Sequence, residues 1–193
     1  CPGHCVFCPT EAYMPKSYLA DEPGAARAFQ NKFNPYDQVQ SRLTEYHAVG
    51  HPNDKIELLI LGGTWSSYKR DYQEWFIRRC FDAMNEDSLP EDQKDFQVEP
   101  PQGKTIPTQI DLTRIQAAHK HNETANHRNV GLVIETRPDE ISRDELVWLR
   151  QLGVTKVQMG AQSLDDRILH LNLRGHTAAD TLKATTLLRA AGF

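Results

Sequence analysis

Long apolar runs are missing from this sequence, and no hydrophobic stretch approaches the roughly 20 residues that cross a bilayer. Cysteine is scarce as well. Four cysteines in 193 residues are too few and too unevenly spaced for the disulfide framework of a small secreted domain. No charge of one sign dominates, because 22 Lys and Arg face 26 Asp and Glu. The net charge of −4 offers no broad basic surface for nucleic acid, and we expect a protein that does not bind membranes.

The cysteines that are present gather at the start of the chain. Cys1, Cys5 and Cys8 fall within eight residues, spaced C-x3-C-x2-C. A loop of this kind can turn three thiolates toward one point. They would hold three irons of a 4Fe–4S cubane and leave the fourth iron open to nitrogen and oxygen donors. S-adenosylmethionine carries both donors, and free thiols of this kind indicate a reducing, cytoplasmic setting.

Other metal sites and roles for the remaining cysteine and histidines have to be weighed. A zinc site would need a fourth Cys or His, and His4 lies too tightly between two of the cysteines to serve. Cys80 falls on the apolar stripe of an expected helix, which favours a buried structural thiol. His119, His121 and His127 either belong to a solvated polar helix or form a histidine metal site.

Strand and helix patterns alternate along the chain, which predicts an α/β fold with a parallel sheet. The apolar run at 55–61 is nearly continuous, which suits a strand covered on both faces. A polar, proline-rich stretch at 85–108 is expected to leave the core. The expected strands span 55–61, 130–135 and 154–159. The expected helices span 25–30, 36–49, 70–84, 108–125, 142–152, 165–171 and 178–191.

Polar or glycine-rich residues follow each expected strand, at the edge where ligands bind in parallel α/β sheets. Gly62-Gly63-Thr64 follows the first strand and either forms a tight turn or lets a cationic amino group approach the backbone. Glu135 and Gln162 end the next two strands and are either hydrogen-bonding loop residues or, from one rim, contacts for ribose hydroxyls. Arg174 is either a surface charge or a clamp for a carboxylate. Arg137 and Asp139 are candidates for a simple ion pair.

Taken together, these motifs resemble the radical S-adenosylmethionine enzymes and, more narrowly, the bacterial or archaeal type of the Elongator catalytic-subunit family, which modifies the tRNA wobble uridine. The similarity covers essentially the whole chain. The matching stretches are Cys5-Val-Phe-Cys8-Pro9, Ser17-Tyr18 with Glu22-Pro23 and Arg27-Ala28, Leu61-Gly-Gly-Thr64, Ile134-Glu-Thr-Arg-Pro-Asp139, Gly160-Ala-Gln-Ser163 and Arg174-Gly-His-Thr177.

The resemblance implies a role for each site residue. The cluster would be bound by Cys1, Cys5 and Cys8, with Phe7 beside it or beside adenine. S-adenosylmethionine would meet Gly62, Gly63 and Thr64 with its amino end, Glu135 and Gln162 with its ribose or amino-acid part, and Arg174 with its carboxylate.

The resemblance also implies a partial (β/α) TIM-like barrel over 1–193. We expect a fragment that lacks the first strand, the C-terminal part of the barrel and a following acetyltransferase domain. The implied activity is that of a radical tRNA-modifying acyltransferase of the carboxymethyluridine synthase type. A radical derived from S-adenosylmethionine would activate an acetyl group from acetyl-CoA, which adds to the uridine. The implied partners are tRNA, acetyl-CoA, a reductant protein, and either a second copy or Elongator-type subunits.

Two other functions remain open at this point. One is a radical oxidase similar to the oxygen-independent coproporphyrinogen oxidases, whose Glu, Gln-Ser and Arg stretches are alike. The block from Ser17-Tyr18 to Arg27 favours the Elongator family over it. The other is a tRNA-binding barrel without catalysis, which the three intact cysteines disfavour.

Overall fold

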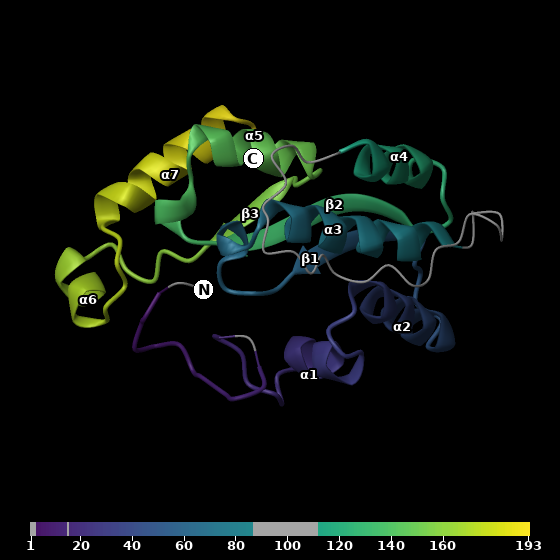
Figure 1. Cartoon of the computed structure of the whole chain (residues 1–193), viewed down its shortest axis with the longest axis horizontal. Helices are drawn as coiled ribbons and strands as arrows, with labels where there is room; N and C mark the ends of the chain where they lie inside the picture. Colours follow the sequence, from purple (N-terminus) through teal and green to yellow (C-terminus); the bar gives the residue numbers. More distant parts are fainter. Residues whose placement is uncertain (1–2, 15, 87–111) are drawn as a thin grey trace. The chain divides into compact units, whose positions relative to one another are not determined.

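The computed structural model describes residues 3–14, 16–86 and 112–193, and Figure 1 traces its helices and strands. Cys1 and most of the proline-rich stretch predicted at 85–108 lie outside the described residues. The strands are β1 (Lys55–Ile60), β2 (Arg128–Thr136) and β3 (Lys156–Met159). The helices are α1 (Pro23–Gln30), α2 (Pro35–Ala48), α3 (Arg70–Asn85), α4 (Thr113–Asn122), α5 (Arg143–Gln151), α6 (Asp166–Leu171) and α7 (Ala178–Ala190), with 3₁₀ turns η1 (Trp65–Ser67) and η4 (Pro138–Glu140).

The described chain divides into two compact units. The first consists of the described residues of Cys1–Ala26, Leu59–Tyr68 and Leu132–Phe193, and the second of those of Arg27–Leu58 and Lys69–Gly131. The boundary passes through β1 and β2, so the carboxyl ends of these strands belong to the first unit. None of the helices in the described ranges is long and apolar enough to span a bilayer.

The three strands form one sheet in the order β1-β2-β3, and β2 pairs with β3 in parallel. The register places Glu135 opposite Gln158. Leu132 and Ile134 on the central strand β2 are fully buried. On the edge strand β1, exposed and covered residues alternate, so only one face is covered and Leu59 is 42% exposed. The α/β class and the parallel pairing are confirmed, whereas burial of 55–61 on both faces is wrong.

In the first unit, α5 and α7 cover β3 with an apolar cluster built from Ile141, Leu146, Ala184 and Leu188, against which Val157 and Met159 pack. Each of these helices begins at a hydroxyl cap. The Ser142 hydroxyl accepts from the Glu145 amide at the start of α5, and Thr177 forms a capping box with Asp180 at the start of α7. These caps fix both helix starts within a residue of the predicted positions.

In the second unit, α3 packs against both α2 and α4. Cys80 on α3 is buried, which confirms the predicted structural thiol. Arg78 and Arg79 are buried as well. Arg78 pairs with Glu74 at 3.2 Å, and Arg79 pairs with Asp82 at 3.0 Å. These two adjacent arginines form a basic pair in the sequence, but in the structure they are buried in ion pairs within α3.

The α4 segment differs from the predicted solvated helix. It is shorter than 108–125 within the described residues, and it buries Ile115 and Ala118 against its neighbours. His119 packs on the ring of Phe81 with a centroid distance of 4.4 Å, and His127 Nδ1 lies 2.8 Å from the Asn53 carbonyl. Across the described residues, no group of three or more metal-binding side chains occurs, and His119 and His127 each contact neighbouring residues of the fold.

Asn122 generates a prediction about the stability of the second unit. Its buried amide donates to Asn85 Oδ1 at 2.7 Å and to the His127 carbonyl at 3.0 Å, and its oxygen accepts from the Asn129 amide at 2.7 Å. Asn122→Ala should lower the free energy of unfolding by about 2–3 kcal/mol, because buried polar groups lose their partners. Urea denaturation measures this change. Gln116→Ala, on the exposed face of α4, should stay within about 0.5 kcal/mol, and an equal loss in both variants would contradict the role of the network.

Candidate cofactor site

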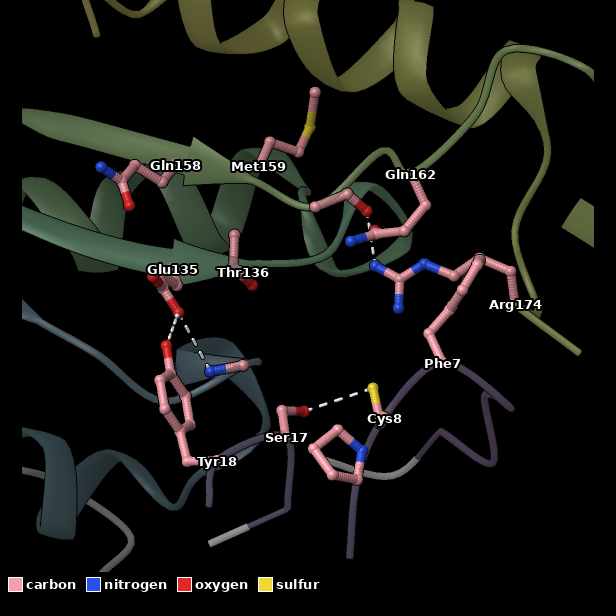
Figure 2. A pocket seen from close by; sticks show the side chains of 13 residues that line it. Phe7, Cys8, Ser17, Tyr18, Glu135, Thr136, Gln158, Met159, Gln162 and Arg174 are labelled. Atoms are coloured by element: carbon pink, nitrogen blue, oxygen red, sulfur yellow. Dashed lines mark hydrogen bonds between the residues drawn. The ribbon is translucent and has the colours of Figure 1, made fainter. Parts of the chain in front are cut away.

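The carboxyl ends of the strands and the N-terminal loop of the first unit enclose a pocket of about 410 Å³ (Figure 2). It combines residues from four separate parts of the sequence, 7–18, 63, 135–136 and 158–174. Among the residues that line it are Cys8, Tyr18, Gly63, Glu135, Gln162 and Arg174. The pocket is therefore a polar site at the strand ends, with a cysteine sulfur at one side.

Glu135, near the end of β2, is held by three donors on one carboxylate oxygen. Oε2 accepts from the Tyr18 hydroxyl at 2.8 Å and from the amides of Gly62 and Gly63 at 3.3 Å each. Burial, and then the hydrogen bond to Glu135, raise the pKa of Tyr18 well above its ordinary value, so the hydroxyl keeps its proton and donates. No described residue bonds to the other oxygen, Oε1, which leaves it for a ligand.

The sulfur side of the pocket is built from the loop between Cys5 and Cys8. The Cys8 amide donates to the Cys5 carbonyl at 3.3 Å, which closes a turn and brings the two cysteines to one end of it. Arg174 Nη1 lies 3.4 Å from Cys5 Sγ, and the Ser17 hydroxyl lies 3.3 Å from Cys8 Sγ. Sulfur atoms with hydrogen-bond donors directed at them suit the thiolate form that binds iron.

Two buried arginines hold the surrounding loops. The Arg137 guanidinium makes two hydrogen bonds to the Asp139 carboxylate, at 2.8 and 2.7 Å, and a third to the Arg174 carbonyl at 2.8 Å. The hydrogen bonds to Asp139 raise the pKa of Arg137, which stays charged, and the predicted pair of these two residues is confirmed. Arg174 Nη2 donates to the Gly160 carbonyl, and its buried Nε has no partner among the described residues.

Glycine lets both guanidinium groups approach the backbone. A Cβ added at Gly160 would lie 2.9 Å from Arg174 Nη2, and one added at Gly3 would collide with Arg137 Nη1. Side chains at these two positions would displace the arginines. The loops that carry the cysteines and Gln162 are thus packed directly against positive charge.

Gln162 stands in a strained turn. Its φ is +61°, and the Ser163 amide donates to the Ala161 carbonyl at 2.8 Å across it, which defines a γ-turn. His176 Nε2 lies 3.3 Å from the same Ala161 carbonyl. Burial, and then the neighbouring Arg174, lower the pKa of His176, so the ring is neutral and can donate through Nε2. The contact from His176, which lies outside the turn, helps to hold the strained backbone at Gln162 and so fixes the direction of the Gln162 side chain.

The pocket brings together most of the residues predicted from the sequence. Gly63, Glu135, Gln162 and Arg174 line it, and so does Phe7, which is 46% exposed. Gly62 and Thr64, which were also predicted to contact the cofactor, are not among the described residues that line the pocket. Thr64 is fully buried, and Gly62 acts through its amide on Glu135. Cys1 lies outside the described residues.

Sequence analysis assigned no role to Ser17 and Tyr18. Both stand in an irregular, proline-bounded segment where neither helical nor strand periodicity gives a side chain a direction. The sequence pointed to them only through the Ser17-Tyr18 stretch that resembles the Elongator catalytic-subunit family. The structure gives each hydroxyl a partner in the site.

The donor set fits an iron–sulfur cofactor. Cys8 lines the polar pocket, whereas Cys5 is buried and is not among the lining residues. Each of these two sulfurs has a hydrogen-bond donor beside it, and the Nε of Arg174 is buried without a partner among the described residues. Fold and site define an α/β protein with a polar pocket at the strand ends, lined in part by a cysteine. The family model of the Radical SAM superfamily matches residues 1–193, and the chain belongs to that superfamily.

Comparison with individual proteins adds detail. The chain is 42% identical to a tRNA uridine(34) acetyltransferase of Methanocaldococcus infernus, over all of this chain and 33% of that protein. It is 31% identical to Elongator complex protein 3 of Dictyostelium discoideum, over 98% of this chain and 31% of that protein. A solved structure of archaeal M. infernus Elp3 with an N-terminal deletion matches 86% of this chain and 34% of its own, with a TM-score of 0.70 and 42% identity. The chain spans about a third of the length of these relatives.

The cysteines generate a prediction about reactivity. Burial raises the pKa of the Cys80 thiol, whereas Cys8 is only half-buried and lines the pocket. In the reduced chain without cofactor, iodoacetamide should modify Cys8 at least about 100-fold faster than Cys80, because Cys80 must first be exposed by unfolding. Peptide mass spectrometry over time measures both rates. Guanidinium should abolish the difference, and equal rates in the folded chain would contradict the structural role of Cys80.

Proposed function

We propose that this chain binds a 4Fe–4S cluster and S-adenosylmethionine in the pocket at the strand ends, and that it is the radical-generating part of an enzyme that modifies the wobble uridine of tRNA with a group derived from acetyl-CoA. Membership of the radical superfamily supports the two cofactors. The names of the relatives support the tRNA reaction. A reducing cytoplasm is the compartment that such a cluster requires.

The observation that carries the proposal is the meeting of Cys8, Glu135, Gln162 and Arg174 around one cavity. A sulfur ligand, a carboxylate, an amide and a guanidinium are the groups that would be needed for a cluster and for a zwitterionic nucleoside bound side by side. These residues lie as far apart as 166 positions in the chain, from Cys8 to Arg174 (174 − 8).

On the cluster side, Cys1, Cys5 and Cys8 would supply the three thiolates. The Arg174 guanidinium near Cys5 Sγ places a fixed positive charge beside these anionic ligands, which stabilises them where solvent is partly excluded. A cluster held by these residues would provide one-electron chemistry, through which S-adenosylmethionine could give carbon radicals.

On the side of S-adenosylmethionine, the chain offers complementary groups. The open Oε1 of Glu135 would accept from ribose hydroxyls, and the backbone at Gly63 would meet the amino end. The Gln162 amide, aimed by its strained turn, would contact the ribose or the amino-acid part. Arg174 would attract the carboxylate through its charge while its Nη atoms hold Cys5 and Gly160.

The first prediction from this proposal concerns both cofactors. Anaerobic reconstitution should load about four irons per chain, the stoichiometry of the cubane. Cys5→Ala or Cys8→Ala should abolish this loading, and Cys80→Ala should not. In the loaded chain, Arg174→Ala should weaken S-adenosylmethionine binding by about 1.5–3 kcal/mol, the worth of a hydrogen bond to a charged group. Iron analysis and equilibrium dialysis measure these effects.

Glycine variants provide the matched control for the pocket. Gly63 has a φ of +65°, and a Cβ there would lie 3.2 Å from Ser17 Oγ, so Gly63→Val adds both backbone strain and crowding to the site. Gly50 has a φ of +70° with open space around it, so Gly50→Val adds the strain alone. Gly63→Val should cost at least about tenfold in affinity, and Gly50→Val should cost little. Full affinity in Gly63→Val and Arg174→Ala together would place the cofactor elsewhere.

The tRNA reaction generates a separate prediction. A chimera in which this chain replaces the matching third of the M. infernus relative should convert unmodified tRNA, with reductant, S-adenosylmethionine and acetyl-CoA, to a carboxymethyl-type uridine. The same chimera with Glu135→Gln should lose at least about tenfold in product, since the carboxylate that holds the cofactor is gone. Digestion of the tRNA and mass spectrometry of its nucleosides provide the measurement.

Two outcomes would count against the tRNA proposal. If the chimera binds both cofactors but forms no modified uridine, this chain does not support the uridine reaction. Formation of the product by the 193 residues alone would contradict the expectation from the sequence that an acetyltransferase domain is needed for the reaction.

A further inference from the structure

Ser17 and Tyr18 are neighbours in the chain, and their hydroxyls hold opposite sides of the pocket (Figure 2). Ser17 Oγ donates to Cys8 Sγ at 3.3 Å, and Tyr18 Oη donates to Glu135 Oε2 at 2.8 Å. We propose that these two are positioning residues, Ser17 acting through the Cys8 thiolate and Tyr18 through the Glu135 carboxylate, so that one dipeptide sets the cluster ligand and the S-adenosylmethionine contact relative to each other. The inference rests on the proposed function and deepens it.

The backbone of this dipeptide is fixed to the cysteine loop. The Ser17 amide donates to the Pro9 carbonyl at 3.2 Å, and Lys16 Nζ donates to the Gly3 carbonyl at 2.6 Å. Ser17 itself has a φ of +90°, a strained value for a residue with a side chain. Strain of this kind persists only where the surroundings impose it, and here it turns the hydroxyl toward Cys8 while the next side chain reaches β2.

Tyr18 provides the shortest of the three hydrogen bonds to Glu135 Oε2, since both glycine amides lie 3.3 Å away. The ring stands at the pocket wall, so its hydroxyl can be removed without opening a cavity in the core. Without it, only the two longer amide contacts restrain the carboxylate, and Oε1 loses its fixed direction. Tyr18→Phe should therefore weaken S-adenosylmethionine binding roughly 5- to 10-fold, less than the full worth of one hydrogen bond to a charged group, because the two glycine amides still restrain the carboxylate.

Ser17 acts on the electronics of the cluster ligand. A hydroxyl that donates to a thiolate stabilises negative charge on sulfur, and the reduced cluster carries more negative charge than the oxidised one. Hydrogen bonds to sulfur are accordingly among the factors that set cluster potentials. Ser17→Ala should shift the midpoint potential to a more negative value, with S-adenosylmethionine affinity changed by less than about twofold.

The test measures two quantities in each loaded variant of the chain: the midpoint potential by redox titration followed by electron paramagnetic resonance, and the affinity for S-adenosylmethionine by equilibrium dialysis. Ser17→Ala should move the potential alone, and Tyr18→Phe the affinity alone, so each variant is the control for the other. Tyr13→Phe, on a tyrosine that is 82% exposed, should change neither. Ser17→Gly, which accepts the positive φ, replaces Ser17→Ala if that variant fails to load.

A double-mutant cycle identifies the path of the Tyr18 effect. If Tyr18 acts through Glu135, Tyr18→Phe should cost nothing further once Glu135→Gln is present. Additive losses, or an unchanged potential in both Ser17 variants, would overturn the inference. Loss of affinity in Glu135→Gln with full affinity in Tyr18→Phe would overturn this inference while the proposed pocket stands. Full affinity in both would overturn the pocket as well.

Discussion

Two buried guanidinium groups hold the site together. Arg137 is neutralised by Asp139 and donates to the Arg174 carbonyl, while Arg174 extends to Cys5 Sγ and the Gly160 carbonyl. Removing a hydrogen-bond partner from a buried charge is costly, so each arginine constrains the loops to which it is bonded. The loops after β2 and β3 and the cysteine loop consequently share one arrangement, on which the pocket between them depends.

Much of this arrangement could be predicted from the sequence. The alternation of strands and helices predicted the α/β class, and parallel strands bring their carboxyl ends to one edge. That rule alone placed Glu135 and Gln162 at a common rim, where both line the pocket. The predicted starts of α5 and α7 lie within a residue of the observed ones, where Ser142 and Thr177 cap the helices, because capping geometry is local.

The remainder depends on contacts that local patterns do not encode. Tyr18 and Glu135 are separated by 117 positions, and nothing in an irregular loop indicates which strand its tyrosine will reach. For α4, the weak apolar periodicity did not indicate burial, because the buried residue Asn122 is polar and its hydrogen-bond partners lie on other elements. The exposure of β1 was likewise invisible, because an apolar run does not show that its strand lies at the sheet edge.

The close approach of glycine to guanidinium has a consequence for how such a site can change over generations. A methyl group at Gly160 needs the space of Arg174, and one at Gly3 needs the space of Arg137. Either guanidinium must therefore move before its glycine can acquire a side chain, and a moved guanidinium gives up its hydrogen bonds to the loops. A change at one of these glycines is thus expected to require a compensating change at its arginine.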